Sequence, residues 1–335
     1  MSELWLAAGA ILAGFIGLIW SADRFVAGSA AIASNLGVPK LIVGLTIVSF
    51  GTSAPEIVVS ISASMKGTGE LAVGNALGSN LANIGLVLGI TALVAPLPIQ
   101  RHLLTQEIPL LIAVTALAGF LLVDANLLRW EGALLLVALV PVMGYSIISK
   151  NKHPSPEEED ADIPDMGNLT AALWFVVGLA ILIGSSELLV WGAVQVATTF
   201  GVSPLVIGLT VIAVGTSLPE LAASIVSALK GHHDIALGNI IGSNVFNILA
   251  VMSVPGLIQQ PAMEIEVFER DYLMMAAITL LLAIAITVDY FVRNLDTPEG
   301  EARGSHGRLG RRIGSLLLLS YVGYYVLLFS NTAQT

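Results

Sequence analysis

The stretch Gly51-Thr52-Ser53-Ala54-Pro55-Glu56, preceded by Gly44-Leu45-Thr46, places a carboxylate inside an otherwise apolar part of the chain. The pattern returns in the second half of the chain as Gly208-Leu209-Thr210 followed by Gly215-Thr216-Ser217-Leu218-Pro219-Glu220. Aligned without a gap, residues 37–89 and 201–253 are identical at 24 of 53 positions, mostly at Gly, Pro, Ser, Thr, Asn and Glu. Self-similarity at one fixed spacing indicates an internal duplication.

The composition is that of a membrane protein. Hydrophobic residues make up 56% of the chain and charged residues 11%, whereas soluble proteins average about 25% charged residues. Apolar runs of about 20 residues, the length that crosses a hydrocarbon core, follow one another along the sequence. The net charge of -10 lies largely in residues 157–165 and 264–271, and no basic patch suggests a nucleic acid. The absence of cysteine excludes disulfides and thiolate metal sites, and we expect no cofactor.

Ten membrane spans are predicted, in two groups of five. The first group covers about residues 4–25, 38–65, 70–94, 105–123 and 127–149. The second covers about residues 169–199, 202–229, 235–258, 272–292 and 309–330. We therefore predict an all-helical polytopic protein with a first five-helix repeat (1–149), an acidic linker (150–167) and a second five-helix repeat (168–335). A single copy of this chain could suffice for function.

The odd number of spans per repeat has a geometric consequence. The second repeat enters the membrane from the opposite side, so a pseudo-two-fold axis in the membrane plane relates the two repeats. Cytoplasmic loops carry the excess of Lys and Arg, and one side holds ten such residues against three. The ten are Lys40, Arg101, Lys150, Lys152, Lys230, Arg293, Arg303, Arg308, Arg311 and Arg312; the three are Lys66, Arg129 and Arg270. This predicts a plasma-membrane protein with both termini outside the cell.

Glu56 and Glu220 fall near the middle of spans two and seven. A carboxylate at that depth costs about 2.5 kcal/mol or more and by default marks an ion or proton path. The pseudo-two-fold brings the two acids face to face, and neither motif contains Lys, Arg or His. Two such charges match one divalent cation, or a set of monovalent cations and protons. A purely structural role is the alternative, and repetition at mid-span argues against it.

Residues around each glutamate supply further oxygen ligands. Pro55 and Pro219 each remove a backbone donor, and a glycine four residues earlier loosens the same turn. We therefore predict broken helices at the membrane midplane. A break frees carbonyl groups, which a bilayer tolerates only where the backbone lines a cavity inside the protein. The predicted ligands are the carbonyls of Ser49 and Ala213 and the hydroxyls of Thr52, Ser53, Thr216 and Ser217.

The span after each motif carries amides and hydroxyls. Gly74-Asn75, Gly78-Ser79-Asn80 and Asn83 correspond to Gly238-Asn239, Gly242-Ser243-Asn244 and Asn247. Residues four apart share a helix face, so Ser79 aligns with Asn83 and Ser243 with Asn247. Asn75, Asn80, Asn239 and Asn244 are as readily helix-joining amides as ligands. Oxygen ligands favour Na⁺, Ca²⁺ or Mg²⁺ over zinc or copper, and a dense protein cage suits Ca²⁺ better than Mg²⁺.

At these residues the chain resembles the calcium/cation antiporter superfamily, specifically its prokaryotic sodium/calcium exchanger-like members. The two glutamate motifs are similar to that family's paired α-repeat signatures, and the two Gly-Asn-x-x-Gly-Ser-Asn stretches to its second signature pair. The resemblance implies exchange of Ca²⁺ for Na⁺, with spans one and six sliding across a fixed core. It implies that Glu56 and Glu220 are the central ligands. Around them it implies Thr52, Thr216, Ser53, Ser217, Ser79, Ser243, Asn83 and Asn247.

One departure from the family concerns Asn247. Some exchangers have an acidic residue at this position, whereas here Asn83 and Asn247 are identical. The coupling ion and stoichiometry therefore stay open, and H⁺- or K⁺-linked calcium exchange is the nearest alternative. A cation channel would also use carboxylates and carbonyls, usually as rings around an oligomeric axis, which duplication within one chain disfavours. An enzyme is disfavoured because the spans contain no nucleophile–base pair.

Other polar residues receive simpler interpretations. Asp23 and Glu187 occupy equivalent positions in spans one and six. We interpret them as headgroup-level residues at helix ends, with an ion vestibule as the alternative. His232-His233 is interpreted as an exposed loop pair, and the acidic run 157–160 as a solvated loop.

Overall fold

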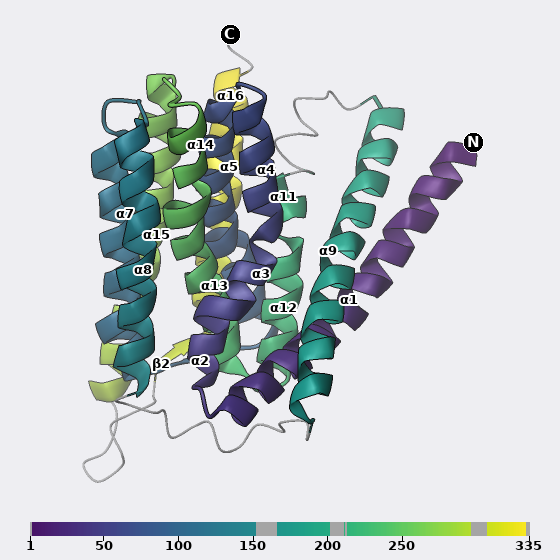
Figure 1. Ribbon diagram of the computed structural model, residues 1–335, viewed down its shortest axis with the longest axis vertical. Helices are drawn as coiled ribbons and strands as arrows, with labels where there is room; N and C mark the ends of the chain where they lie inside the picture. The colour runs from purple at the N-terminus through teal and green to yellow at the C-terminus, as the bar shows by residue number, and fades with distance from the viewer. Residues whose placement is uncertain (1, 152–165, 202–210, 212, 296–306, 333–335) are drawn as a thin grey trace. The chain divides into compact units, whose positions relative to one another are not determined.

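The computed structural model describes residues 2–151, 166–201, 211, 213–295 and 307–332. Figure 1 shows that most of the described chain is helical. Before the linker, the elements are α1 (Ser2–Leu36), α2 (Lys40–Val43), η1 (Gly44–Val48), α3 (Ser49–Thr52), α4 (Ala54–Met65), α5 (Gly69–Ala82), η2 (Asn83–Leu88), α6 (Gly89–Val94), β1 (Leu97–Ile99), η3 (Leu103–Glu107), α7 (Ile108–Leu122) and α8 (Arg129–Asn151), where η marks a π-helical segment.

After the linker a similar series of helices recurs, but its strand precedes only the last helix, whereas β1 precedes the last two. These elements are α9 (Asn168–Thr199), α11 (Ala213–Thr216), α12 (Leu218–Leu229), α13 (His233–Phe246), η6 (Asn247–Val251), α14 (Ser253–Ile258), η7 (Val267–Tyr272), α15 (Leu273–Leu295), β2 (Gly307–Leu309) and α16 (Arg311–Thr332). Helices α5 and α13 begin and end at equivalent positions of the two sequence repeats, and so do α4 and α12. The sequence duplication is therefore also a duplication of local structure.

Most of the predicted membrane spans are long apolar helices in the structure. Seven pass by length and composition: Glu3–Leu36, Gly69–Val94, Leu103–Leu122, Arg129–Ile148, Asn168–Thr199, His233–Ile258 and Val267–Arg293. The bent pair Lys40–Thr52 and Ala54–Met65 makes eight. Predicted span seven includes 202–210 and 212, which lie outside the described residues, and predicted span ten corresponds to α16. The helical, polytopic class is confirmed, whereas ten spans in inverted repeats stay a prediction.

The helix that carries the first motif is broken at Ser53. Helix α3 ends before Ser53, which has φ -82° and ψ 7°, and the flanking segments are bent by 44°. Ser217, with φ -90° and ψ 4°, separates α11 from α12 in the same way. Pro55 and Pro219 therefore lie in the first turn of the next helix, where a missing N–H costs no hydrogen bond. The predicted broken helices are confirmed, with each break two residues before the proline.

The chain forms two compact units that differ from the two sequence repeats. Unit 1 comprises Met1–Pro55 and Lys150–Asn239, and unit 2 comprises Glu56–Ser149 and Ile240–Thr335. Each unit combines parts of both repeats, and two of the boundaries fall inside α4 and α13. The division at 149 and 168, which follows the duplication, stays a prediction.

In unit 1, α1 and α9 lie along each other (Figure 1). The rings of Phe25 and Phe175 are 5.1 Å apart between centroids, and the Arg24 guanidinium lies 4.9 Å from the ring centroid of Trp174. Apolar side chains from α1, α2, η1, α9, α12 and α13 meet in one core. Its buried members are Leu18, Ala22, Phe25, Val26, Ala30, Ala33, Val43, Val48, Leu182, Ala223 and Ile235.

Two glycines bring α13 close to α2 and η1 within unit 1. A Cβ added to Gly238 would lie 2.8 Å from the Leu41 carbonyl oxygen, and one added to Gly44 would lie 2.8 Å from the Ile235 carbonyl oxygen. Real Cβ atoms do not tolerate such distances, so any larger residue would push the two backbones apart. This approach places Asn239, the residue after Gly238, beside the helix that carries Thr52.

In unit 2, the span formed by α5, η2 and α6 packs against α15 and α16. The backbones of α6 and α16 touch, because a Cβ on Gly314 would lie 2.7 Å from the Gly89 carbonyl oxygen. Unit 2 also contains a short antiparallel sheet, β1–β2, which lies outside the predicted spans except at Leu309, the predicted start of span ten. Leu97, Ile99 and Leu309 are fully buried, and Leu97 pairs with Leu309. This small sheet buries alternate apolar residues and leaves the predicted all-helical class unchanged.

Candidate cation-binding site

The predicted ligands are distributed over both units. Unit 1 holds Ser49, Thr52, Ser53, Ala213, Thr216, Ser217 and Glu220, whereas unit 2 holds Glu56, Ser79, Asn83, Ser243 and Asn247. Their side chains are buried with few exceptions: Thr216 is half-buried, and the side chain of Ala213 lies outside the description. Each unit therefore contains one of the two glutamates together with hydroxyl or amide groups.

In unit 1 the first motif contacts the acid of the second. The Ser53 hydroxyl donates a hydrogen bond to Glu220 Oε1 at 3.1 Å, and both side chains are almost fully buried. Ser53 is held there by the break between α3 and α4, whereas Glu220 lies in the first turn of α12. A helix N-terminus favours a negative charge. Glu220 thus receives a hydroxyl donor from the break in the first motif while it lies at the N-terminal end of its own helix.

Asn239 joins the two motifs on the same side of unit 1. Its amide nitrogen donates to the Glu220 carbonyl oxygen at 3.3 Å and to the Ser224 hydroxyl at 2.9 Å. Its amide oxygen accepts a hydrogen bond from the Thr52 hydroxyl at 3.0 Å. Asn239 is fully buried, and both ends of its amide are engaged, so it joins helices.

The backbone at the two breaks differs from the predicted pattern. The carbonyl of Ser49 accepts the Ser53 N–H at 3.0 Å, so the expectation that the break frees it is wrong. In the second repeat the Ser217 N–H donates to the Val214 carbonyl at 3.1 Å, so this break is tighter than the first. A proline deprives the carbonyl four residues before it of its donor. Before Pro219 that carbonyl is Gly215, whose oxygen accepts the Ser186 hydroxyl of α9 at 2.9 Å.

In unit 2, Glu56 shares its backbone contact with its repeat counterpart, whereas its carboxylate has a different partner. The Ser79 hydroxyl donates to Glu56 Oε1 at 3.4 Å, a long hydrogen bond, and Glu56 is 1% exposed. The Asn75 amide nitrogen donates to the Glu56 carbonyl oxygen at 3.3 Å. This is the contact that Asn239 makes to Glu220, reproduced at the equivalent position of the first repeat. Both glutamates therefore have their backbone held by an amide from the following helix.

Asn83 and Asn247 differ from the other amides in unit 2. They are 1% and 0% exposed, and within the described residues neither their amide nitrogens nor their amide oxygens have a hydrogen-bond partner. Each begins a π-helical segment, η2 or η6, and such segments occur frequently at functional sites. An unpartnered buried amide normally costs about 1–3 kcal/mol. A cation bound to the amide oxygen would offset the share of that cost that belongs to the oxygen, so both residues suit the predicted role.

The two remaining amides make contacts to helix backbone. Asn80 donates to the Asn244 carbonyl oxygen at 3.3 Å and lies 3.5 Å from the Met275 sulfur. Asn244 donates to the Ile240 carbonyl oxygen of its own helix at 2.7 Å. These contacts favour a structural role for both residues. The sequence alone had favoured a structural role and a ligand role equally.

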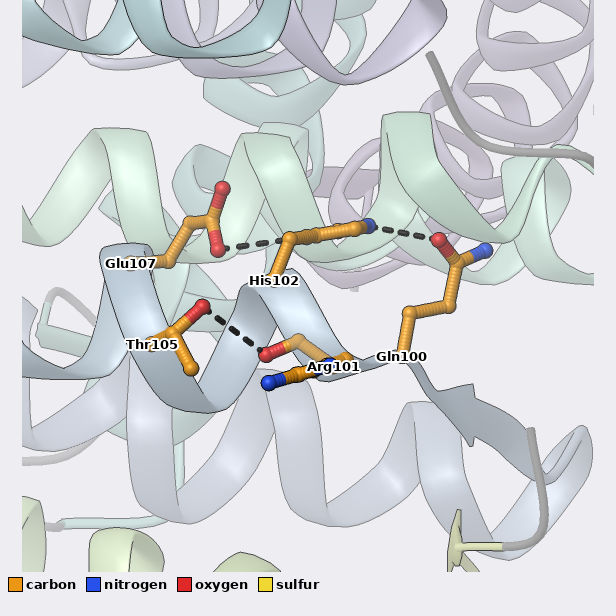
Figure 2. A network of polar contacts seen from close by, with 5 residues as sticks. All are labelled: Gln100, Arg101, His102, Thr105 and Glu107. Atoms are coloured by element: carbon orange, nitrogen blue, oxygen red, sulfur yellow. Dashed lines mark hydrogen bonds and ion pairs between the residues drawn. The ribbon is translucent and has the colours of Figure 1, made fainter. Parts of the chain in front are cut away.

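One buried acid outside the motifs, Glu107, has a basic partner. Figure 2 shows the His102 ring between Glu107 and Gln100, with His102 Nδ1 3.2 Å from Glu107 Oε2 and His102 Nε2 2.6 Å from Gln100 Oε1. Because Glu107 already faces an imidazole, it is a weaker candidate for binding a transported cation than Glu56 or Glu220. The motifs of those two acids contain no basic residue.

Asp23 and His232 both lie in unit 1. Asp23 forms an ion pair with Lys230 at 2.6 Å. It lies inside α1, which continues to Leu36, so the interpretation as a residue at a helix end is wrong. His232 is 1% exposed, so the interpretation as an exposed loop residue is wrong. Burial lowers the pKa of His232 to about 4, and the positive charges of Lys40, Lys230 and His233 add to this effect.

Two polar residues at the site escaped the sequence analysis. Ser224 accepts a hydrogen bond from Asn239, and Ser186 donates to the Gly215 carbonyl. Ser224 corresponds to Ser60 and is one of the identical positions of the duplication, so the repeat contained a signal for it. Ser186 corresponds to Ala22 and had no such signal. Within the described ranges, no group of three or more His, Cys, Asp and Glu could hold a metal.

Comparison with known proteins supports the class of cation antiporter that the two motif pairs predict. The family model described as sodium/calcium exchanger protein matches residues 6–148 and 170–330. CaxA of Alkalimonas amylolytica is 46% identical over 328 residues, 96% of this chain and 98% of CaxA. Inner membrane protein YrbG of Escherichia coli (strain K12) is 38% identical over 286 residues, 83% of this chain and 88% of YrbG. The structure of the sodium-calcium exchanger NCX_Mj, soaked with zero Na⁺ and Ca²⁺, has a TM-score of 0.80 and 29% identity, covering 97% of this chain and 99% of NCX_Mj.

The helical membrane fold and the duplicated, buried glutamates define a multi-pass cation transporter. More particularly, the chain belongs to the sodium/calcium exchanger family. The resemblance drawn from the two motif pairs is thereby confirmed. Membership indicates calcium/cation antiport, the activity of the family, and the family is one of transporters and not of enzymes.

Proposed function

We propose that this protein exchanges Ca²⁺ for Na⁺ across the plasma membrane by alternating access, and that Glu56 and Glu220 bind the transported ion. The observation that carries the proposal is the hydrogen bond from Ser53 to Glu220 Oε1 at 3.1 Å. A hydroxyl of the first motif meets the carboxylate of the second, and Ser53 precedes Glu56 by only three residues. The unpartnered amides of Asn83 and Asn247 add further oxygen ligands.

The chemistry of these groups favours Ca²⁺ and Na⁺ as alternative occupants. Hydroxyl, amide, carbonyl and carboxylate oxygens suit hard cations, and Ca²⁺ accepts 6–8 such ligands in a flexible arrangement. One Ca²⁺ balances two carboxylates, and Na⁺ ions of similar radius can occupy the same oxygens. Because the two occupancies exclude each other, one site can couple an inward flow of Na⁺ to an outward flow of Ca²⁺. The names of NCX_Mj and of the family point to the same pair of ions.

The same charges explain why access would change only when the site is loaded. An empty pair of buried carboxylates carries uncompensated charge away from water, which is costly. Bound Ca²⁺ or Na⁺ removes that cost and allows the site to close on both sides. We further propose that the termini lie outside the cell, because that orientation puts ten of thirteen basic residues in the cytoplasm.

Calcium uptake into proteoliposomes tests this function. Vesicles loaded with Na⁺ and diluted into Na⁺-free buffer should take up ⁴⁵Ca²⁺, whereas vesicles loaded with choline should not. Glu56→Gln and Glu220→Gln should each lower the initial rate by about tenfold or more, since an interaction with a charged group contributes about 1.5–3 kcal/mol. Glu70→Gln, which changes an exposed acid of α5, is the matched control and should transport normally.

The competing coupling ions are tested in the same vesicles. A pH gradient or an outward K⁺ gradient, each without Na⁺, should leave uptake at background. Uptake driven only by the pH gradient would replace Na⁺ by H⁺ as the coupling ion, and uptake that needs K⁺ would add K⁺ to the cycle. Wild-type transport by either glutamine variant would disprove the proposed site.

A further inference from the structure

The amide of Asn239 has a fixed orientation between two proposed ligands. Its nitrogen must face the Glu220 carbonyl, which can only accept a hydrogen bond, at 3.3 Å. The amide oxygen therefore faces the Thr52 hydroxyl, which lies 3.0 Å away. Asn239 itself is fully buried, and its remaining amide hydrogen reaches Ser224 at 2.9 Å. Both donors and the oxygen are thus engaged in unit 1, and the residue spans from the first motif to the second.

The Thr52 hydroxyl has a single hydrogen and more than one acceptor within reach. The Asn239 amide oxygen is at 3.0 Å, and the Ser49 carbonyl oxygen of the same helix is at 3.4 Å. The shorter contact draws the hydrogen toward Asn239. The Ser49 carbonyl already accepts the Ser53 N–H and has two lone pairs. Its second lone pair therefore becomes engaged by Thr52 only if the hydroxyl turns away from Asn239.

We propose that Asn239 is a positioning residue for the cation site, which holds Thr52 and Glu220 at a fixed spacing and keeps the Thr52 hydrogen away from the Ser49 carbonyl. It touches no transported ion and acts through these ligands. The inference rests on the proposed function, because it treats Thr52, Ser49 and Glu220 as ligands. Asn75 occupies the equivalent position and makes the equivalent bond to the Glu56 carbonyl at 3.3 Å, so each repeat supplies one such amide.

Asn239 thereby also determines which cation fits. A cage of oxygens selects an ion by the distance between them, provided that the oxygens are held rigidly. Without the Asn239 amide, Thr52 turns its hydroxyl to the Ser49 carbonyl, and the spacing between Thr52 and Glu220 is no longer fixed. The site then binds Ca²⁺ more weakly and discriminates less between Ca²⁺ and the larger Sr²⁺.

Equilibrium binding to the purified full-length protein in detergent tests the proposal. Binding of ⁴⁵Ca²⁺, and its displacement by Sr²⁺, is measured for wild type, Asn239→Ala, Thr52→Val and the double variant. Asn239→Ala should weaken Ca²⁺ binding by about two- to tenfold, the range for loss of one neutral hydrogen bond. In the Thr52→Val background the same change should have less than about a twofold effect, because residues that act through each other are not additive. The ratio of Ca²⁺ to Sr²⁺ affinity should fall in both single variants.

Asn244→Ala is the control, because it changes a buried amide whose nitrogen donates to the backbone of its own helix. It should leave the ratio of affinities unchanged. Equal effects of Asn239→Ala in the two backgrounds, or an unchanged ratio, would overturn the proposal. If Asn239→Ala does not fold, the comparison of Thr52→Ser with Thr52→Val decides. Thr52→Ser keeps the hydroxyl and should preserve the wild-type ratio of affinities, and a lowered ratio in Thr52→Ser refutes the inference. Binding does not depend on the coupling ion, so wild type that binds Ca²⁺ without Na⁺-driven uptake contradicts only the proposed function.

Discussion

Replacing asparagine by leucine at two positions of the same span should have opposite effects on stability. Leucine has the same heavy-atom branching as asparagine but no polar atoms. Asn239 makes three hydrogen bonds, each worth about 0.5–1.5 kcal/mol, so Asn239→Leu should destabilise the protein by about 1.5–4.5 kcal/mol. The Asn247 amide has no partner within the described residues. Asn247→Leu should therefore stabilise the cation-free protein, by up to about 1–3 kcal/mol.

Thermal unfolding of the detergent-purified protein, with EDTA and then with Ca²⁺, measures both effects. In EDTA the order of midpoints, from highest to lowest, should be Asn247→Leu, wild type, Asn239→Leu. Saturating Ca²⁺ should raise the wild-type midpoint, because a ligand that binds only the folded state stabilises it. For Asn247→Leu this rise should be small or absent, since a ligand oxygen is missing.

The result that would refute the reasoning is a loss of stability in Asn247→Leu comparable to that in Asn239→Leu. Asn247 would then be a bonded structural amide and not a ligand. A normal Ca²⁺-dependent rise in Asn247→Leu would lead to the same conclusion. Asn83→Leu gives an independent repetition, because Asn83 is equally buried and equally unpartnered in the described part of the chain.

Three further predictions concern parts of the molecule outside the site. His232 has a pKa of about 4 in the folded protein against 6.5 in the unfolded chain. As the pH drops from 6.5 to 4, the unfolded state binds the proton first, so the stability of the protein should fall. His232→Gln should flatten a plot of unfolding midpoint against pH in that window. Asp23→Asn breaks a half-exposed ion pair with Lys230 and should change the unfolding free energy by less than about 1 kcal/mol, an effect that Lys230→Gln should not increase in a double-mutant cycle. The chain has no cysteine, so single cysteines can report on the proposed orientation. Thr68→Cys should react with an impermeant maleimide on intact cells, and Ser155→Cys only after permeabilisation. The reverse pattern would invert the proposed orientation.

The sequence was sufficient to predict the class and most helix positions. Apolar runs of sufficient length and a gap-free internal repeat are strong signals, and the repeat reappears in the bounds of α5 and α13. The sheet between Leu97–Ile99 and Gly307–Leu309 was missed because strands this short have too little periodicity to distinguish them from loops. The burial of His232 was missed because it depends on packing around the turn between α12 and α13 and not on its own residue type.

At the site, residue types could be predicted but hydrogen-bond partners could not. The acids, hydroxyls and amides were all identifiable from duplication at membrane depth. Free carbonyls were predicted at Ser49 and Ala213, whereas the structure engages the Ser49 oxygen with the Ser53 N–H. Ser53 and Ser217 both lie two residues before the proline. The Ser53 N–H nevertheless donates to the carbonyl four residues earlier and the Ser217 N–H to the one three residues earlier, a difference that two nearly identical motifs do not predict.

Equivalent residues with different partners are informative about how a duplicated transporter works. Ser60 donates to the Val251 carbonyl at 2.9 Å, whereas its counterpart Ser224 accepts from Asn239. Identical side chains thus make unequal contacts in one structure, so the two repeats share sequence and helix bounds but differ in these hydrogen bonds. A transporter that opens to one side at a time requires such inequality, since two equal inverted halves would open equally to both sides. Each repeat carries the residues for both arrangements. We therefore expect that an exchange of roles between the repeats gives a second state of similar energy, and that ligand binding selects between the two states.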